Sequence, residues 1–123
     1  MSDLHETYPQ YHSDLFNKLN FPFQGGKKVL DIGCGGGIDS TIFADHYKLD
    51  THASDLFRHT NFDNLKQVKF KSGSIFKLPY PNSSFDYAFL HDVLHHVDEQ
   101  RQAKNRHKSA LNEAFRVVKK GGS

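Results

Sequence analysis

The stretch VLDIGCGGGIDS, residues 29–40, constrains the fold of this 123-residue chain more than any other segment. An apolar run that contains Asp31 leads into four glycines within residues 33–37. A short apolar run that is bounded by glycines is typical of a buried parallel strand. A glycine-rich turn from a strand into a helix exposes main-chain groups and lets a ligand approach them closely. The segment therefore predicts a strand, a ligand-binding turn and a helix.

The spacing of the glycines excludes one common class of nucleotide-binding loop and disfavours a second. A phosphate-binding P-loop needs Lys followed by Ser or Thr after its last glycine, and Gly37 is followed by Ile38 instead. The dinucleotide fingerprint G-x-G-x-x-G needs a small residue at position 38, so it is also disfavoured. The remaining pattern is acidic-x-G-x-G-x-G, formed by Asp31, Gly33, Gly35 and Gly37. An acidic residue in the turn would repel a pyrophosphate but suits a cationic ligand.

The rest of the chain alternates predicted strands with helices or long crossovers. We expect strands at 28–33, 49–55, 68–74 and 85–92, and helices at 13–21, 38–47 and 99–119. Residues 56–67 should be irregular, 77–84 should form a loop, and 1–12 should be flexible or loosely packed. This order predicts an α/β fold with a doubly wound parallel sheet, which binds ligands at the carboxyl ends of its strands.

Two helices carry more detailed predictions. Ser13 should cap the first helix, and Pro22 should end it. The last helix should begin after a capping Asp98 and bury one apolar face. That face comprises Ala103, His107, Ala110, Leu111, Ala114, Phe115 and Val118.

Composition narrows the compartment and the partners. The net charge of +2, without a block of Lys or Arg, argues against nucleic-acid binding. Cys34 is the single cysteine, so an intrachain disulfide is excluded, which fits a reducing compartment. No apolar run approaches membrane-spanning length, and the polar N-terminus is unlike a signal peptide. We therefore expect a cytoplasmic protein that does not enter a membrane.

Four segments in order resemble the class I S-adenosylmethionine-dependent methyltransferases, especially their small-molecule methyltransferase-like domains. The first is the glycine motif, and the others are ASDLF, GSIFKLPYPNSSFDYAFLHDVLHHV and EAFRVVKKGGS. The resemblance covers residues 27–123 and implies a Rossmann-like sheet with strand order 3-2-1-4. The family's strands 5–7 would follow Ser123, where this chain ends. It also implies an N-terminal segment with a short helix at 1–26 and an S-adenosylmethionine-binding domain at 27–123.

The resemblance implies roles for individual residues toward the cofactor. Asp31 and the main chain at Gly33, Cys34 and Gly35 would hold the methionine moiety, and Gly37 completes the motif. Asp55 would bind the ribose hydroxyls, with Leu56 beside the adenine and Ser74 and Ile75 along the adenine edge. His91 would face the sulfonium and the methyl acceptor. Where the family often has Asp, this chain has Ser74, a weaker acceptor for the adenine amine, so we expect modest cofactor affinity.

Catalysis requires a general base only if the acceptor is a protonated hydroxyl or amine. His91 and His95 are the candidate bases, and Asp92 could orient one imidazole, although His95 could equally pack or face solvent. Their four-residue separation faintly resembles the metal-binding H-E-x-x-H pattern. Because His91 should end a strand, the helical spacing is broken, and we predict no metal site. Cys34 lacks a designated base and is not expected to act as a nucleophile.

The N-terminal residues Tyr8, Tyr11 and His12 could form a lid over the site, or they could be a disordered tail. Two function hypotheses remain open. The chain is a methyltransferase for an unidentified, small-molecule acceptor, or it is a catalytically incomplete cofactor-binding fragment or subunit. In the second case another copy, a partner or further C-terminal residues would cover the aromatic edge at 85–92, because exposed apolar edges tend to pair.

Overall fold

A single parallel sheet organises the chain. The structure, a computed structural model, describes residues 10–19, 21–90 and 103–120. The strands are β1 (Lys28–Ile32), β2 (Asp50–Asp55), β3 (Val68–Ser72) and β4 (Tyr87–Leu90), in the order β3-β2-β1-β4. Every pairing is parallel, so the predicted α/β class and the strand order are confirmed. This order places β3 at one edge of the sheet and β4 at the other.

Strand β1 lies at the centre of the sheet and is covered on both faces. Leu30 pairs with His52 on one side and with Ala88 on the other. The four residues from Val29 to Ile32 are buried, which is why β1 reads as a continuous apolar run interrupted only by Asp31. The carboxyl end of β1, where the glycines begin, thus lies between the ends of β2 and β4.

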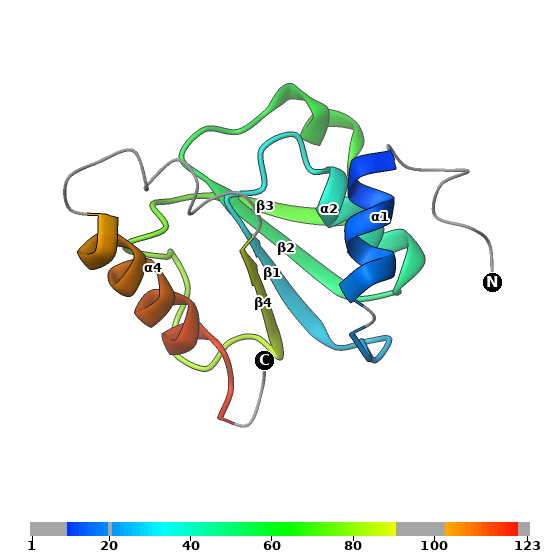
Figure 1. Ribbon diagram of the computed structural model, residues 1–123. Helices are drawn as coiled ribbons and strands as arrows, with labels where there is room; N and C mark the ends of the chain where they lie inside the picture. Colours follow the sequence, from blue (N-terminus) through cyan, green and yellow to red (C-terminus); the bar gives the residue numbers. More distant parts are fainter. Residues whose placement is uncertain (1–9, 20, 91–102, 121–123) are drawn as a thin grey trace.

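Helices cover both faces of the sheet (Figure 1). Helix α1 (Gln10–Leu19) and helix α2 (Ile38–Thr41), which continues into the π-helical turn η2 (Ile42–His46), lie on one side, and α4 (Ala103–Val117) lies on the other. The core under α1 and η2 consists of Phe16, Val29, Ile42, Phe43 and Leu49. The core under α4 consists of Leu30, Ile32, Leu78, Phe85, Ala114 and Val117. A third, smaller cluster (Ala53, Phe62 and Val68) packs beneath the 3-10 turn η3 (Thr60–Asn64).

Helix α1 begins earlier than the sequence predicts. Residues 10–12 are helical, although they were expected to be flexible or loosely packed, and Ser13 lies inside the helix rather than at its cap. The reason is tertiary: the His12 ring bonds to Asp39 and Phe16 is buried, so the helix is held by residues distant in sequence. Local periodicity does not report such contacts.

Helix α4 buries a narrower face than predicted. Ala110, Ala114 and Val117 are buried, whereas Leu111 and Phe115 are 38% and 72% exposed, so the inclusion of these two in the core was wrong. Small residues at positions 110 and 114 bring the helix close to the sheet, and the larger side chains project away from it. The predicted cap Asp98 lies outside the described residues. Among the helices that the structure describes, none is both long and apolar enough to cross a membrane.

The loop at 77–84 is held to α4 by one arginine. The Arg116 guanidinium donates to the Glu113 carboxylate, to the carbonyl oxygens of Leu78 and Tyr80, and to Asn82. Glu113 also accepts the Leu78 N–H at 2.8 Å. These bonds fix the loop that leads from β3 into β4, and with it the position at which β4 joins the sheet.

We predict that Phe43→Ala destabilises the fold by about 3–5 kcal/mol, as expected for removal of a buried aromatic ring. Phe43 is fully buried, and its ring packs edge-on against Phe16, Phe23 and Phe89. Phe57→Ala is the matched control, because that ring is 84% exposed and its loss should change stability by no more than about 0.5 kcal/mol. Urea unfolding measures both values, and equal effects would contradict this account of the core.

Candidate functional site

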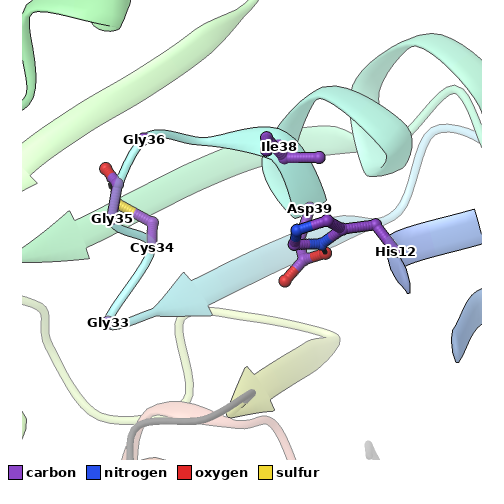
Figure 2. A pocket seen from close by; sticks show the side chains of 7 residues that line it. All are labelled: His12, Gly33, Cys34, Gly35, Gly36, Ile38 and Asp39. Atoms are coloured by element: carbon purple, nitrogen blue, oxygen red, sulfur yellow. Dashed lines mark hydrogen bonds and ion pairs between the residues drawn. The ribbon is translucent and has the colours of Figure 1, made fainter. Parts of the chain in front are cut away.

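A cavity of about 240 Å³ lies at the carboxyl end of β1. It is lined by His12 of α1, the glycine turn, and Ile38 and Asp39 of α2. Figure 2 shows the turn on one side of this space, with the His12 ring and the Asp39 carboxyl close together on the other side. The cavity therefore lies where doubly wound sheets bind ligands, and the glycine turn forms one of its walls.

The glycine turn is tied to the end of β2. The N–H groups of Gly33 and Cys34 both donate to the Ser54 carbonyl oxygen, at 2.8 and 3.2 Å. The Gly35 N–H donates to Asp55 Oδ2 at 2.9 Å. Three successive main-chain donors thus bond to the protein itself, so they do not form an anion-binding nest in this conformation. This geometry agrees with the exclusion of a P-loop from the sequence.

Glycine suits positions 37 and 35 of the turn for two different structural reasons. Gly37 has φ +85°, and a Cβ there would lie 2.9 Å from side-chain atoms of Phe62 and Leu65, so a larger residue would clash with the cover formed by η3. Gly35 has φ +54°, and a Cβ there would meet nothing within 4 Å. The backbone at Gly35 therefore faces open space, where a ligand can approach it.

Asp31 lies beneath the turn rather than in the cavity lining. It is only 2% exposed, and its Oδ2 accepts a 2.6 Å hydrogen bond from the Ser40 hydroxyl. Burial, reinforced by the nearby charge of Asp39, raises the pKa of the Asp31 carboxyl to about 8. The carboxyl is therefore mostly protonated at neutral pH, unless a cation bound nearby favours its charged form.

The other predicted cofactor residues gather at the same edge of the sheet. Asp55 ends β2, and its second oxygen accepts the Leu56 N–H at 2.7 Å, so its orientation is fixed. Leu56 is exposed beside it. The Gly73 N–H donates to the Asp55 carbonyl oxygen, which brings the following Ser74 close to Asp55. The Ser74 hydroxyl accepts the Phe76 N–H at 3.1 Å, so part of its bonding capacity is used locally.

Three further predictions concern Cys34, Ile75 and the histidines after β4. Burial, followed by the charges of Asp31 and Asp55, raises the pKa of the Cys34 thiol, so the thiolate that a nucleophile requires is suppressed. Ile75 is partly buried and packs against the core under α4.

His91 and His95 lie outside the described residues. Leu90, immediately before them, pairs with Ile32 next to the glycine turn. Among the described side chains, no group of three or more His, Cys, Asp or Glu could hold a metal ion.

Three residues of the site were not among the predicted cofactor contacts. His12 and Asp39 line the cavity, and His12 Nδ1 lies 2.7 Å from Asp39 Oδ1. Asn61 of η3 donates to the Gly36 carbonyl oxygen at 3.2 Å and ties the turn to η3. Asp39 could have been found from the sequence, because it lies in the first helical turn after the glycines. His12 and Asn61 reach the site only through tertiary packing.

We predict that Asp31→Asn makes stability less dependent on pH. The unfolded Asp31 releases its proton above about pH 4, whereas the folded protein retains it until about pH 8, so the wild type loses stability as the pH rises through this interval. The amide side chain of the variant does not titrate. Asp31→Asn should therefore be more stable than the wild type near pH 8, with a gap that shrinks toward pH 4.

Urea midpoints measured near pH 5 and near pH 8 test this prediction. The control is Asp63→Asn, because the Asp63 side chain is 62% exposed in its ion pair with Arg58. A difference between the wild type and Asp31→Asn that is the same at both pH values would contradict the assignment of a raised pKa to Asp31.

The comparison with known protein families gives one match over most of the chain. The profile of the family described as "Methyltransferase domain" matches residues 30–123. The 27-O-demethylrifamycin SV methyltransferase of Amycolatopsis mediterranei is 28% identical over 112 residues, which is 82% of this chain and 38% of that protein. The sarcosine/dimethylglycine N-methyltransferase of Aphanothece halophytica is 29% identical over 112 residues, 84% of this chain and 37% of that protein.

The fold agrees with solved structures of the same kind. The phosphoethanolamine N-methyltransferase 2 of Haemonchus contortus, in complex with phosphomonomethylethanolamine and S-adenosylhomocysteine, aligns with a TM-score of 0.72 and 20% identity. The alignment covers 89% of this chain and 25% of that one. The present chain thus spans less than half the length of each of these three proteins.

Proposed function

The chain belongs to the methyltransferase domain family, and we propose on that basis that it is a class I S-adenosylmethionine-dependent enzyme that transfers a methyl group to a small-molecule acceptor. The observation that carries the proposal is the cavity beside the glycine turn, together with Asp55 held at the end of the neighbouring strand. When bound, S-adenosylmethionine supplies an activated methyl group on a sulfonium centre. The protein supplies binding, orientation and exclusion of water.

The residues at the site fit this cofactor in charge and in shape. Three carboxyl groups, those of Asp31, Asp39 and Asp55, surround the turn, and the cofactor carries positive charge on its sulfonium and ammonium groups. Gly35 leaves its backbone open to a ligand. A pyrophosphate would meet these same carboxyl groups and be repelled, so the donor set favours a cationic ligand over a dinucleotide.

Asp55 is the residue that we expect to hold the ribose. Each of its oxygens already accepts one backbone N–H, from Gly35 and Leu56, and a carboxylate oxygen has two lone pairs. Each oxygen therefore retains capacity for one ribose hydroxyl without rearrangement. Leu56 would lie against the adenine, and Ser74 and Ile75 would lie along its edge. This arrangement positions the nucleoside, while the turn positions the methionine end.

The proposed methyl acceptor is a small molecule. The relatives named above act on a rifamycin, on sarcosine and dimethylglycine, and on a phosphoethanolamine derivative, which supports a small-molecule acceptor here. His91 and His95 are proposed as its general-base candidates, because they follow β4 at the carboxyl edge of the sheet. A single cysteine supports a reducing compartment, and we propose a cytoplasmic location.

We predict that Asp55→Ala weakens S-adenosylmethionine binding by at least about tenfold, through loss of the bonds to the ribose and of the anchor on Gly35. Isothermal titration calorimetry measures the dissociation constant. Asp63→Ala, an exposed substitution in the connection between β2 and β3, is the control and should leave the constant unchanged. An unchanged constant for Asp55→Ala would refute the ribose assignment. Absence of heat and of a thermal shift for the wild type at millimolar cofactor would refute the proposed function.

A second candidate function is that of a cofactor-binding unit that transfers methyl groups only when its sheet is completed. All four residues of β4 are half-buried, and Phe115 on the adjacent α4 is 72% exposed. Val118 already forms a parallel bridge with Phe85 just before β4, with the Lys119 N–H donating to the Phe85 carbonyl oxygen. These features favour an additional element beside β4, from a partner, a second copy or further C-terminal residues.

For this second candidate we predict that the purified chain binds S-adenosylmethionine but self-associates as its concentration rises. Phe115→Asp should shift it toward monomer, because a charge on the exposed apolar face opposes burial there. Light scattering coupled to size exclusion measures the mass, and Phe57→Asp, at an 84% exposed position in the connection between β2 and β3, is the control. A monomeric wild type that transfers methyl groups to small-molecule acceptors would exclude this candidate.

A further inference from the structure

His12 and Asp39 both line the cavity, and the proposed function gives neither of them a specific contact with the cofactor. Asp39 stands in the first turn of α2, and His12 stands on α1, 27 positions away in sequence. Their side chains are only 10% and 21% exposed, so the 2.7 Å contact is largely removed from water. A contact of this length between a ring nitrogen and a carboxylate is a strong, charge-assisted bond when the ring is protonated.

Asp39 is the carboxyl group that faces the cavity. Asp31 is buried beneath the turn with Ser40, and its raised pKa favours the neutral form. Asp55 is bonded to two backbone N–H groups at the end of β2, and it does not belong to the cavity lining. A ligand ammonium group in the cavity would therefore meet Asp39 before either of the other two carboxyl groups.

His12 supplies a side chain that can carry the opposite charge. Of the seven residues that line the cavity in the described part of the chain, His12 is the one whose side chain can be cationic. The N–H groups of Gly33, Cys34 and Gly35 bond to β2, so these three donors do not replace it as an anion partner. A ligand carboxylate in the cavity would therefore depend on the imidazole for its charged contact.

The size of the cavity matches one end of the cofactor. A volume of about 240 Å³ corresponds to roughly eight waters at ~30 Å³ each. The amino-acid end of S-adenosylmethionine, from its α-carboxylate to its sulfur, is of that size, whereas the adenosine moiety needs further space. The ribose partner Asp55 lies beyond Gly35, outside this cavity, where the nucleoside would extend.

We propose that the His12–Asp39 pair recognises the zwitterionic amino-acid end of the cofactor, with Asp39 accepting from the α-ammonium group and His12 donating to the α-carboxylate. When the imidazole is protonated, the pair is a cation beside an anion and the ligand end is its complement, so the two dipoles can align antiparallel. This inference rests on the proposed function. It makes α1 part of the binding site and assigns His12 a binding role rather than that of a tail residue.

Calorimetry with three ligands separates the contributions of the two residues. S-adenosylmethionine has both charged groups, decarboxylated S-adenosylmethionine lacks only the carboxylate, and 5′-methylthioadenosine has neither. His12→Gln should weaken S-adenosylmethionine binding about tenfold and should not weaken the binding of the other two ligands. Asp39→Asn should weaken both amine-containing ligands by a similar factor and leave 5′-methylthioadenosine unchanged.

The controls are Asn17→Ala on the exposed face of α1 and Asp45→Asn on the exposed face of η2, neither of which should alter any of the three constants. Thermal unfolding of each variant verifies that it is folded. Equal weakening of all three ligands by His12→Gln, or no weakening of S-adenosylmethionine, would overturn the inference while leaving the proposed function intact. A wild type that binds none of the three ligands would overturn both.

Discussion

The pairing of β1 between β2 and β4 is the constraint on which the rest of the structure depends. Because β1 is buried on both faces, its backbone must bond on both edges, and its side chains must fill two cores at once. Its carboxyl end then has one exit, into the glycine turn, which bonds to the Ser54 carbonyl oxygen and the Asp55 carboxylate of β2. The cavity therefore follows from the same hydrogen bonds that hold the sheet together.

Electrostatics at this end of the sheet explains why the site favours a cationic ligand. Asp31, Asp39 and Asp55 surround one turn, and the free energy of ionising Asp31 is raised by burial and by the charge of Asp39. In the proposed complex, a ligand with an ammonium and a sulfonium group would relieve that repulsion, and an anionic ligand would increase it. Clustering of carboxyl groups is thus unfavourable in the free protein, and the same carboxyl groups complement the positive charges of the proposed cofactor.

The two sides of the molecule differ in how completely they are covered. On one side, rings from α1, η2 and β4 pack against one another, with the centroids of Phe16, Phe43 and Phe89 separated by 5.0 to 5.6 Å. On the other side, α4 contacts the sheet through small residues and Val117, and Phe115 remains exposed. In the proposed complex, the cofactor would bind at the carboxyl edge against α1 and the glycine turn, and the second candidate function would in addition require a cover over β4.

Much of this protein follows from its sequence alone. Glycine spacing, the apolar run before it and the alternation of strands and helices predicted the parallel sheet and the carboxyl-edge site, because these patterns reflect local conformation and burial. The early start of α1, the exposure of Leu111 and Phe115, and the meeting of His12 with Asp39 were decided by tertiary structure. Each depends on which distant surface packs against a helix, and periodicity within one segment contains no information about that surface.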